Sequence, residues 1–152
     1  MYNINLNDSI DSASADQKNT ANEGKLTRVI YRSRSLMEEG GEHVILEGCR
    51  KKNPLLEVTG VLVSHSGWFM QVLEGSDANI KKLVEVIKAD PRHTDFLVIS
   101  TTVINKRDFN DWSMASITVD ELRFNQIVKQ CMEGNNNAIE EVRDFLFYGK
   151  WQ

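Results

Sequence analysis

The segment WFMQVLEG, from Trp68 to Gly75, limits the folds open to this chain more than any other stretch. It is typical of a β-strand, whose alternate side chains point to opposite faces of a sheet. Such a strand is apolar on both faces, because one face carries Phe69, Gln71 and Leu73 and the other carries Trp68, Met70 and Val72. A strand of this kind is expected to be covered on both sides. The amide of Gln71 would then be buried and would need hydrogen-bond partners.

The chain before this segment predicts a strand, a helix and a second strand. LTRVIYRSRS, residues 26–35, alternates in the manner of a strand. GEHVILEGCRKKN, residues 41–53, follows a Gly-Gly break and has helical spacing, and Pro54 ends it because a residue before proline avoids the helical region. Residues 57–75 are typical of a β-hairpin with a polar turn at Ser64 to Gly67.

The chain after this segment predicts a second helix and two more strands. Ser76 or Asp77 can cap the helix, whose apolar residues fall at offsets 0, 3, 4 and 7 from Ile80. Residues 96–104 predict a clear strand, and DWSMASI, residues 111–117, predicts a short last one. The order βαββαββ favours an α+β fold of ferredoxin-like topology, with both helices on one face of the sheet.

Two further helices are expected near the C-terminus. Apolar residues recur at offsets 0, 3, 4 and 7 from Phe124, after a cap at Asp120. Asn137, with Glu140 three residues later, predicts a capping box for the last helix. We expect these helices to pack on the other face of the sheet and to cover residues such as Met70 or Val72.

Composition excludes several classes of partner and site. The 152 residues carry a net charge of −4, which argues against binding to nucleic acid or to an anionic membrane. No stretch approaches the roughly 20 apolar residues of a membrane span. Cys49 and Cys131 lie far apart in sequence and predict buried thiols in a reducing cytoplasm. We therefore expect a soluble, cytoplasmic protein.

The familiar catalytic signatures are absent from the sequence. There is no G-x-G-x-x-G turn, no phosphate-binding loop and no G-x-S-x-G elbow. His43, His65 and His93 lie in separate elements, so no metal site is predicted. What remains is a set of polar or distinctive residues in apolar segments: Tyr31, Gln71, Trp112 and Met114. Each of them alone is most simply a core residue with its hydrogen bonds satisfied.

Taken together, five ordered motifs resemble the pattern of the BLUF family of flavin-binding blue-light sensors. The motifs extend from about Leu26 to Met114 and are RVIYRSRS, an asparagine followed seven residues later by the glycine of VTG, FMQVLEG, DPRH and FNDWSM. The resemblance implies a flavin held between the two helices of the βαββαββ sheet. FAD is the expected flavin, with FMN or riboflavin as alternatives.

The resemblance assigns the photochemical switch to residues on the strands. Tyr31 matches the family's photochemical tyrosine, and Gln71 matches the glutamine between that tyrosine and the flavin. Ser33 matches a small hydroxyl residue near the tyrosine. Trp112 and Met114 match a pair on the last strand whose positions are thought to change with signalling.

The resemblance also implies which residues bind the cofactor besides Tyr31 and Gln71. Asn53 matches the asparagine that hydrogen-bonds the flavin ring, and Ile45 would pack in the same pocket. Arg92 and His93 match a basic pair close to the flavin and its side chain. Lys52 stands where the family would carry His or Asn near the ring, which would alter the polarity there.

These predictions divide the chain into a flexible tail at residues 1–24, a photosensor domain at 25–117 and a helical extension at 118–152. The resemblance implies a sensor rather than an enzyme, which acts through a homo-oligomer or a downstream signalling protein. Two alternatives stay open. One is a light-independent, ferredoxin-like interaction module, and the other is an acyl-phosphate hydrolase that uses Arg92 and Asn53, although the Gly-poor turns disfavour it.

Overall fold

The computed structural model of the protein describes residues 25–38 and 41–151. The predicted tail at residues 1–24 lies outside these ranges. In chain order the elements are β1 (Leu26–Ser35), α2 (Gly41–Lys52), η1 (Asn53–Leu56), β2 (Thr59–His65), β3 (Trp68–Ser76), α3 (Asp77–Ala89), β4 (His93–Ile104), β5 (Ala115–Thr118), α4 (Glu121–Met132) and α5 (Asn137–Tyr148). The predicted α+β fold and the βαββαββ order are confirmed.

The five strands form one mixed sheet in the order β4-β1-β3-β2-β5. The four longer strands pair antiparallel, while β5 pairs parallel to β2 from Val61 opposite Ala115. In the centre of the sheet, Tyr31 of β1 lies directly opposite Gln71 of β3, so their side chains share one face.

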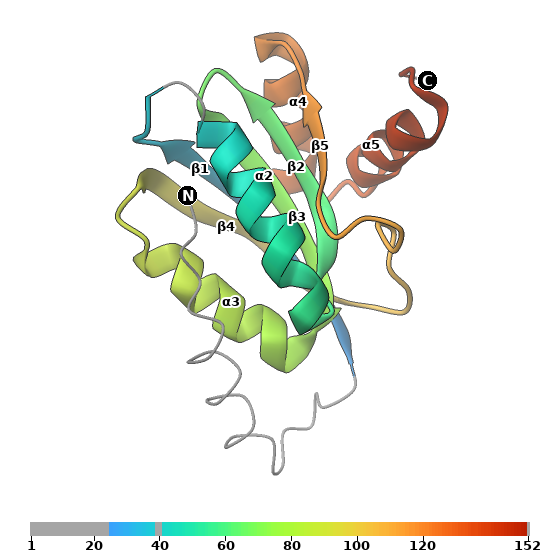
Figure 1. The fold of residues 1–152 in the computed structure, drawn as a ribbon. Helices are drawn as coiled ribbons and strands as arrows, with labels where there is room; N and C mark the ends of the chain where they lie inside the picture. Colours follow the sequence, from blue (N-terminus) through green and yellow to red (C-terminus); the bar gives the residue numbers. More distant parts are fainter. Residues whose placement is uncertain (1–24, 39–40, 152) are drawn as a thin grey trace.

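The sheet is covered on both faces, as the apolar pattern of residues 68–75 predicts. Figure 1 shows α2 and α3 on one face and α4 behind the sheet on the other. The first core, under α2 and α3, includes Tyr31, Ile45, Cys49, Phe69, Leu73, Ile80, Leu83 and Met114. The second core, under α4 and α5, includes Met70, Val72, Phe109, Phe124, Ile127, Ile139 and Val142. Covering of Met70 and Val72 by the C-terminal helices is therefore confirmed.

Local signals define most element ends. The Ser76 side chain accepts a hydrogen bond from the Asn79 amide, so Ser76 rather than Asp77 caps α3. The Asp120 side chain accepts one from the Arg123 amide, which confirms the cap predicted for α4. The hairpin turn is shorter than predicted, because only Ser66 and Gly67 leave the strands. Both have positive φ, at 45° and 85°, as in a two-residue hairpin turn with a right-handed twist.

Two predicted boundaries are wrong. Residues 111–114 are not part of the last strand, which begins at Ala115, because the carbonyls of Trp112 and Ser113 accept bonds from Gly60 and Asn53 instead. The capping box at Asn137 is absent. The cap of α5 is Asn136, and the Asn137 amide donates to the Asn135 side chain.

None of the helices in the described ranges is long and apolar enough to cross a membrane. Likewise, the described residues contain no group of three or more His, Cys, Asp or Glu side chains arranged to hold a metal ion.

Candidate functional site

The centre of the candidate site is a buried hydrogen bond between Tyr31 and Gln71. The Tyr31 hydroxyl donates to Gln71 Oε1, and the two residues are 0% and 1% exposed. The Tyr31 ring also packs 5.1 Å from the ring of Phe96, centroid to centroid. The phenol is thus fixed both by its hydroxyl and by its ring.

The other end of the Gln71 amide faces two sulfur atoms. Its Nε2 donates to Met114 Sδ at 3.5 Å and to Cys49 Sγ at 3.7 Å. Sulfur is a weak acceptor, so these bonds hold the amide less firmly than bonds to oxygen would. Burial raises the pKa of the Cys49 thiol to about 11, which keeps this group neutral at physiological pH.

Asn53 ties the end of the first helix to the segment before β5. Its Nδ2 donates to the Ser113 carbonyl at 2.8 Å, and the side chain is buried. On the last turn of α2, Arg50 Nε donates to the Met114 carbonyl at 3.2 Å. The backbone at Ser113 and Met114 is therefore held by two side chains from the other side of the site.

The basic pair lies at the start of β4, with Arg92 in the turn after α3 and His93 as the first residue of the strand. Arg92 forms a bidentate pair with Asp90, with Nε at 3.1 Å from Oδ1 and Nη2 at 2.8 Å from Oδ2. Burial acts to raise the pKa of Asp90, but the hydrogen bonds from Arg92 outweigh it and lower that pKa. His93 Nε2 lies 2.7 Å from the Ile87 carbonyl, and its ring meets Phe96 edge-on at 5.6 Å. Phe96 thus lies between His93 and Tyr31.

Trp112 lies apart from the Tyr31 and Gln71 pair. Its ring packs 5.1 Å from Phe147 of α5 and 6.5 Å from Phe109, beside the second core. Ile45 is fully buried in the first core, and Lys52 is the half-buried last residue of α2. The structure therefore gathers Tyr31, Gln71 and Met114 and places Trp112 next to the C-terminal helix. The roles of these residues remain predictions.

Sequence reasoning missed two neighbours of the site. Cys49 contacts the Gln71 amide, and Phe96 contacts Tyr31. A signal was present for Cys49, because it falls four residues after Ile45 on the same face of α2. For Phe96 the alternation of β4 predicts only that it lies in a strand, and the packing partner depends on the register with β1.

A comparison with protein families matches residues 26–115 to the family described as "Sensors of blue-light using FAD". The chain belongs to the BLUF family. The resemblance seen in the five motifs is thereby confirmed, and BLUF domains bind a flavin such as FAD.

Relatives of the protein support this membership. A photoactivated adenylate cyclase subunit beta from Euglena longa is 31% identical over 133 residues, covering 85% of this chain but only 15% of the cyclase subunit. Among solved structures, the dark state of BlrB, a BLUF protein, is 28% identical, with a TM-score of 0.67 over 83% of this chain and 98% of BlrB. The photo-activated state of BlsA, at 22% identity and a TM-score of 0.63, shares the fold over 84% of this chain and 98% of BlsA.

The polar side chains on the α2 and α3 side of the sheet are chemically suited to bind a flavin. Among the described residues, the Ser33 hydroxyl is fully buried and has no hydrogen-bond partner. It lies on the same face of β1 as Tyr31, opposite Phe69. A flavin ring offers both donors and acceptors along one edge, and the amides of Asn53 and Gln71 can supply the complementary groups. Tyr31, Asn53 and Gln71 would hold that edge in this BLUF domain.

The buried thiol of Cys49 predicts a loss of stability at alkaline pH. Its pKa is about 11 in the folded protein against 9.0 for an ordinary thiol, so its contribution is full below pH 9 and is lost as the pH rises toward 11. At pH 10.5 this one group should lower the free energy of unfolding by about 2 kcal/mol relative to pH 8. Urea unfolding at both pH values, compared with Cys49→Ala, isolates the effect. An equal pH dependence in both proteins would contradict it.

Proposed function

We propose that this protein is a blue-light photoreceptor that binds a flavin, FAD in the first instance, non-covalently between α2, α3 and the sheet. The observation that carries the proposal is the buried hydrogen bond from Tyr31 to Gln71, with Met114 on the other end of the same amide, in a chain of the BLUF family. A flavin held beside Tyr31, Asn53 and Gln71 would supply the absorption of blue light and an excited state that is a strong oxidant, to which Tyr31 could give an electron and a proton.

Tyr31 is well placed to lose and regain a proton. Its hydroxyl is excluded from water and already points along a hydrogen bond to Gln71 Oε1. The Phe96 ring restricts the movement of the phenol, so the hydroxyl keeps its direction while its charge changes. Tyr31 therefore acts as the donor of the switch.

Gln71 is the residue whose hydrogen bonds differ between the dark state and the light state. An amide has a donor end and an acceptor end of nearly equal size, so rotation or tautomerisation changes the hydrogen bonds with little change in volume. The bonds from Nε2 to Cys49 and Met114 are weak ones to sulfur, so their loss costs little. A rearranged amide that bonds a flavin carbonyl would lower the transition energy and shift the absorption to longer wavelength.

The output of the sensor is proposed to be a change of contact between proteins. A homo-oligomer or a separate signalling protein would read the state of the sensor, and no substrate would be turned over. Trp112 contacts Phe147 of α5, so the segment before β5 joins the site to the C-terminal helices. This is the direction in which a change at Met114 would travel.

The visible absorption spectrum tests this function. The purified protein, reconstituted with FAD, is measured in the dark, after blue light and during recovery in darkness. We expect a flavin band that moves to the red in light and returns thermally. Retained flavin without a reversible shift would rule out the switch, and failure to take up FAD would favour the ferredoxin-like interaction module.

A further inference from the structure

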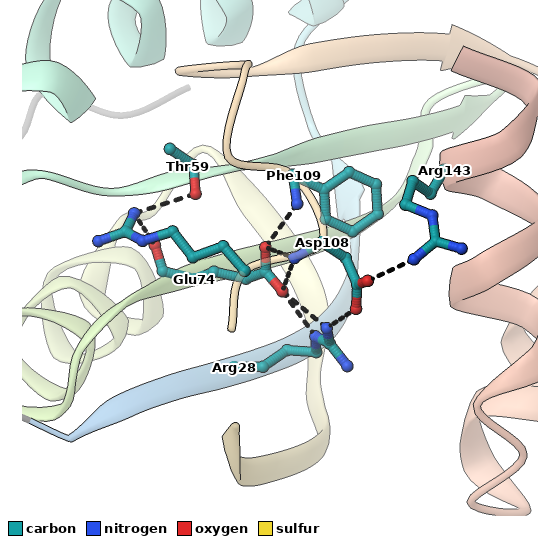
Figure 2. A network of polar contacts seen from close by, with 7 residues as sticks. Arg28, Thr59, Glu74, Asp108, Phe109 and Arg143 are labelled. Carbon is teal, nitrogen blue, oxygen red and sulfur yellow. Dashed lines mark hydrogen bonds and ion pairs between the residues drawn. The ribbon is translucent and has the colours of Figure 1, made fainter. Parts of the chain in front are cut away.

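A network of charged side chains lies on the face of the sheet opposite Tyr31. Figure 2 shows Arg28 of β1, Glu74 of β3, Asp108 of the β4–β5 loop and Arg143 of α5 joined in a chain. The formal charges of the four groups cancel. Glu74 is 0% exposed, so its carboxylate depends on the ion pair with Arg28 for its stability in the folded protein.

Glu74 anchors the β4–β5 loop through the loop backbone. Its Oε1 accepts hydrogen bonds from the amides of Asp108 at 3.0 Å and Phe109 at 2.9 Å. Its Oε2 accepts from Arg28 Nε and Nη2 at 2.9 and 2.7 Å. In addition, Arg107 Nη1 donates to the Glu74 carbonyl at 3.1 Å and to Thr59 Oγ1 at 3.0 Å. Three successive loop residues are thus bonded to one strand residue.

Asp108 extends this anchor to the C-terminal helix. Arg28 Nη2 donates to Asp108 Oδ2, and Arg143 Nη1 donates to Asp108 Oδ1 at 2.7 Å. Burial acts to lower the pKa of Arg143, but the hydrogen bond and charge of Asp108 outweigh it and raise that pKa. The Asp108 carboxylate is therefore the junction between the sheet and α5.

The other end of the same loop forms part of the candidate site. The Trp112 amide donates to the Phe109 carbonyl, both at the turn that leads to β5. Immediately after it, the Ser113 carbonyl accepts from Asn53, and Met114 Sδ accepts from Gln71. Met114 comes only five positions after Phe109, whose amide is bonded to Glu74. A displacement of Met114 can therefore be transmitted to the charged network through residues 109–114, a short segment whose backbone is held by several hydrogen bonds.

We propose that the Asp108–Arg143 pair, carried on a loop whose backbone Glu74 fixes against the sheet, makes α5 respond when Met114 moves. The inference rests on the proposed function and names the route of its output. The side chain of Glu74 lies on the opposite face of the sheet from that of Gln71. It acts through the loop backbone, from a position three residues after Gln71 on the same strand.

Of the two ion pairs in the network, Asp108–Arg143 should break more easily than Arg28–Glu74. The Arg28–Glu74 pair is buried and joined by two hydrogen bonds, whereas the side chain of Arg143 is 30% exposed. Partly exposed ion pairs are weaker than buried ones with several hydrogen bonds. Release of α5 would uncover its buried residues Ala138, Ile139 and Val142, which gives the light state an apolar surface for a partner.

Hydrogen–deuterium exchange on the FAD-loaded full chain tests this route. Wild type, Arg143→Met and Asp144→Asn are compared in the dark and under continuous blue light, with absorption recorded on the same samples. In the wild type, light should raise exchange in residues 137–148 about fivefold or more. In Arg143→Met these residues should exchange about fivefold faster already in the dark, with no further rise in light and with the red shift retained.

Asp144→Asn is the matched control, because Asp144 also contacts Arg143, at 3.5 Å, but has no bond to the loop. It should behave as the wild type. A wild-type light response in Arg143→Met would overturn the inference, as would a wild type whose spectrum shifts while exchange in α5 stays constant. A wild type whose spectrum does not shift overturns the proposed function itself, and the absorption record alone identifies that outcome.

Discussion

Tyr31→Phe should abolish the reversible red shift while leaving the flavin bound. The change removes one hydroxyl, the donor to Gln71 Oε1, and keeps the ring that packs 5.1 Å from Phe96. Without the hydroxyl, the side chain has no proton to give and the Gln71 amide loses its fixed partner. Absorption spectra in the dark, after blue light and during recovery measure the effect, which we expect to be a complete loss of the shift.

The same variant should be folded but less stable. Leaving the buried Gln71 oxygen without this donor should cost about 1–3 kcal/mol in the free energy of unfolding, measured in urea. Tyr148→Phe is the matched control, because Tyr148 is 69% exposed at the end of α5. It should keep both the shift and the stability. A reversible shift that survives in Tyr31→Phe would mean that another residue is the donor, and the proposed switch would be wrong.

Most of the fold could be predicted because the elements have clean periodic patterns. The strand at residues 26–35 and the cap at Asp120 lie at the predicted positions, and Ser76 is the cap out of the two alternatives, Ser76 and Asp77. These features depend on alternation and on a single side chain near a helix start, which are local properties. Covering of both faces of β3 followed from its apolar pattern alone.

The segment before β5 could not be predicted, since its bonds are to residues distant in sequence. The sequence pattern predicts a strand at Trp112 and Ser113, but their carbonyls accept hydrogen bonds from the Gly60 amide and the Asn53 side chain. The cap of α5 failed for a related reason. Three asparagines in a row, at residues 135–137, all suit a cap, and the local sequence does not choose among them.

For the candidate site, the sequence supplied the pair at its centre but not the network behind it. Gln71 is a polar residue in an otherwise apolar strand, which by itself predicts a buried amide with hydrogen-bond partners. Glu74, three residues later, is also buried, and a carboxylate needs partners even more than an amide does. A buried carboxylate at Glu74 therefore predicts a cation beside it. Local sequence does not identify this cation as Arg28, because the choice among the arginines depends on the pairing of β1 with β3.

Gly60→Ala should have the largest effect on stability. Gly60 lies on β2 opposite Leu73, two residues before the position that pairs with Gln71. A Cβ at this position would lie 2.0 Å from the Val72 carbonyl oxygen, a backbone atom in the centre of the sheet. The strands would have to separate, which would also strain the bond from the Gly60 amide to the Trp112 carbonyl. We expect a loss of at least about 3 kcal/mol, or no folded protein.

Gly75→Ala separates this steric effect from the general cost of replacing glycine in a strand. A Cβ on Gly75 would lie 3.2 Å from Val58 Cγ2, a side-chain atom that can shift by a few tenths of an ångström. Urea unfolding of both variants should therefore show a much smaller loss for Gly75→Ala. Equal losses would mean that the close approach of β2 to Val72 is not a constraint. A large loss of stability in Gly60→Ala alone would mean that Gly60, the glycine seven residues after Asn53, is required for a steric reason: β2 and β3 approach too closely there for any side chain.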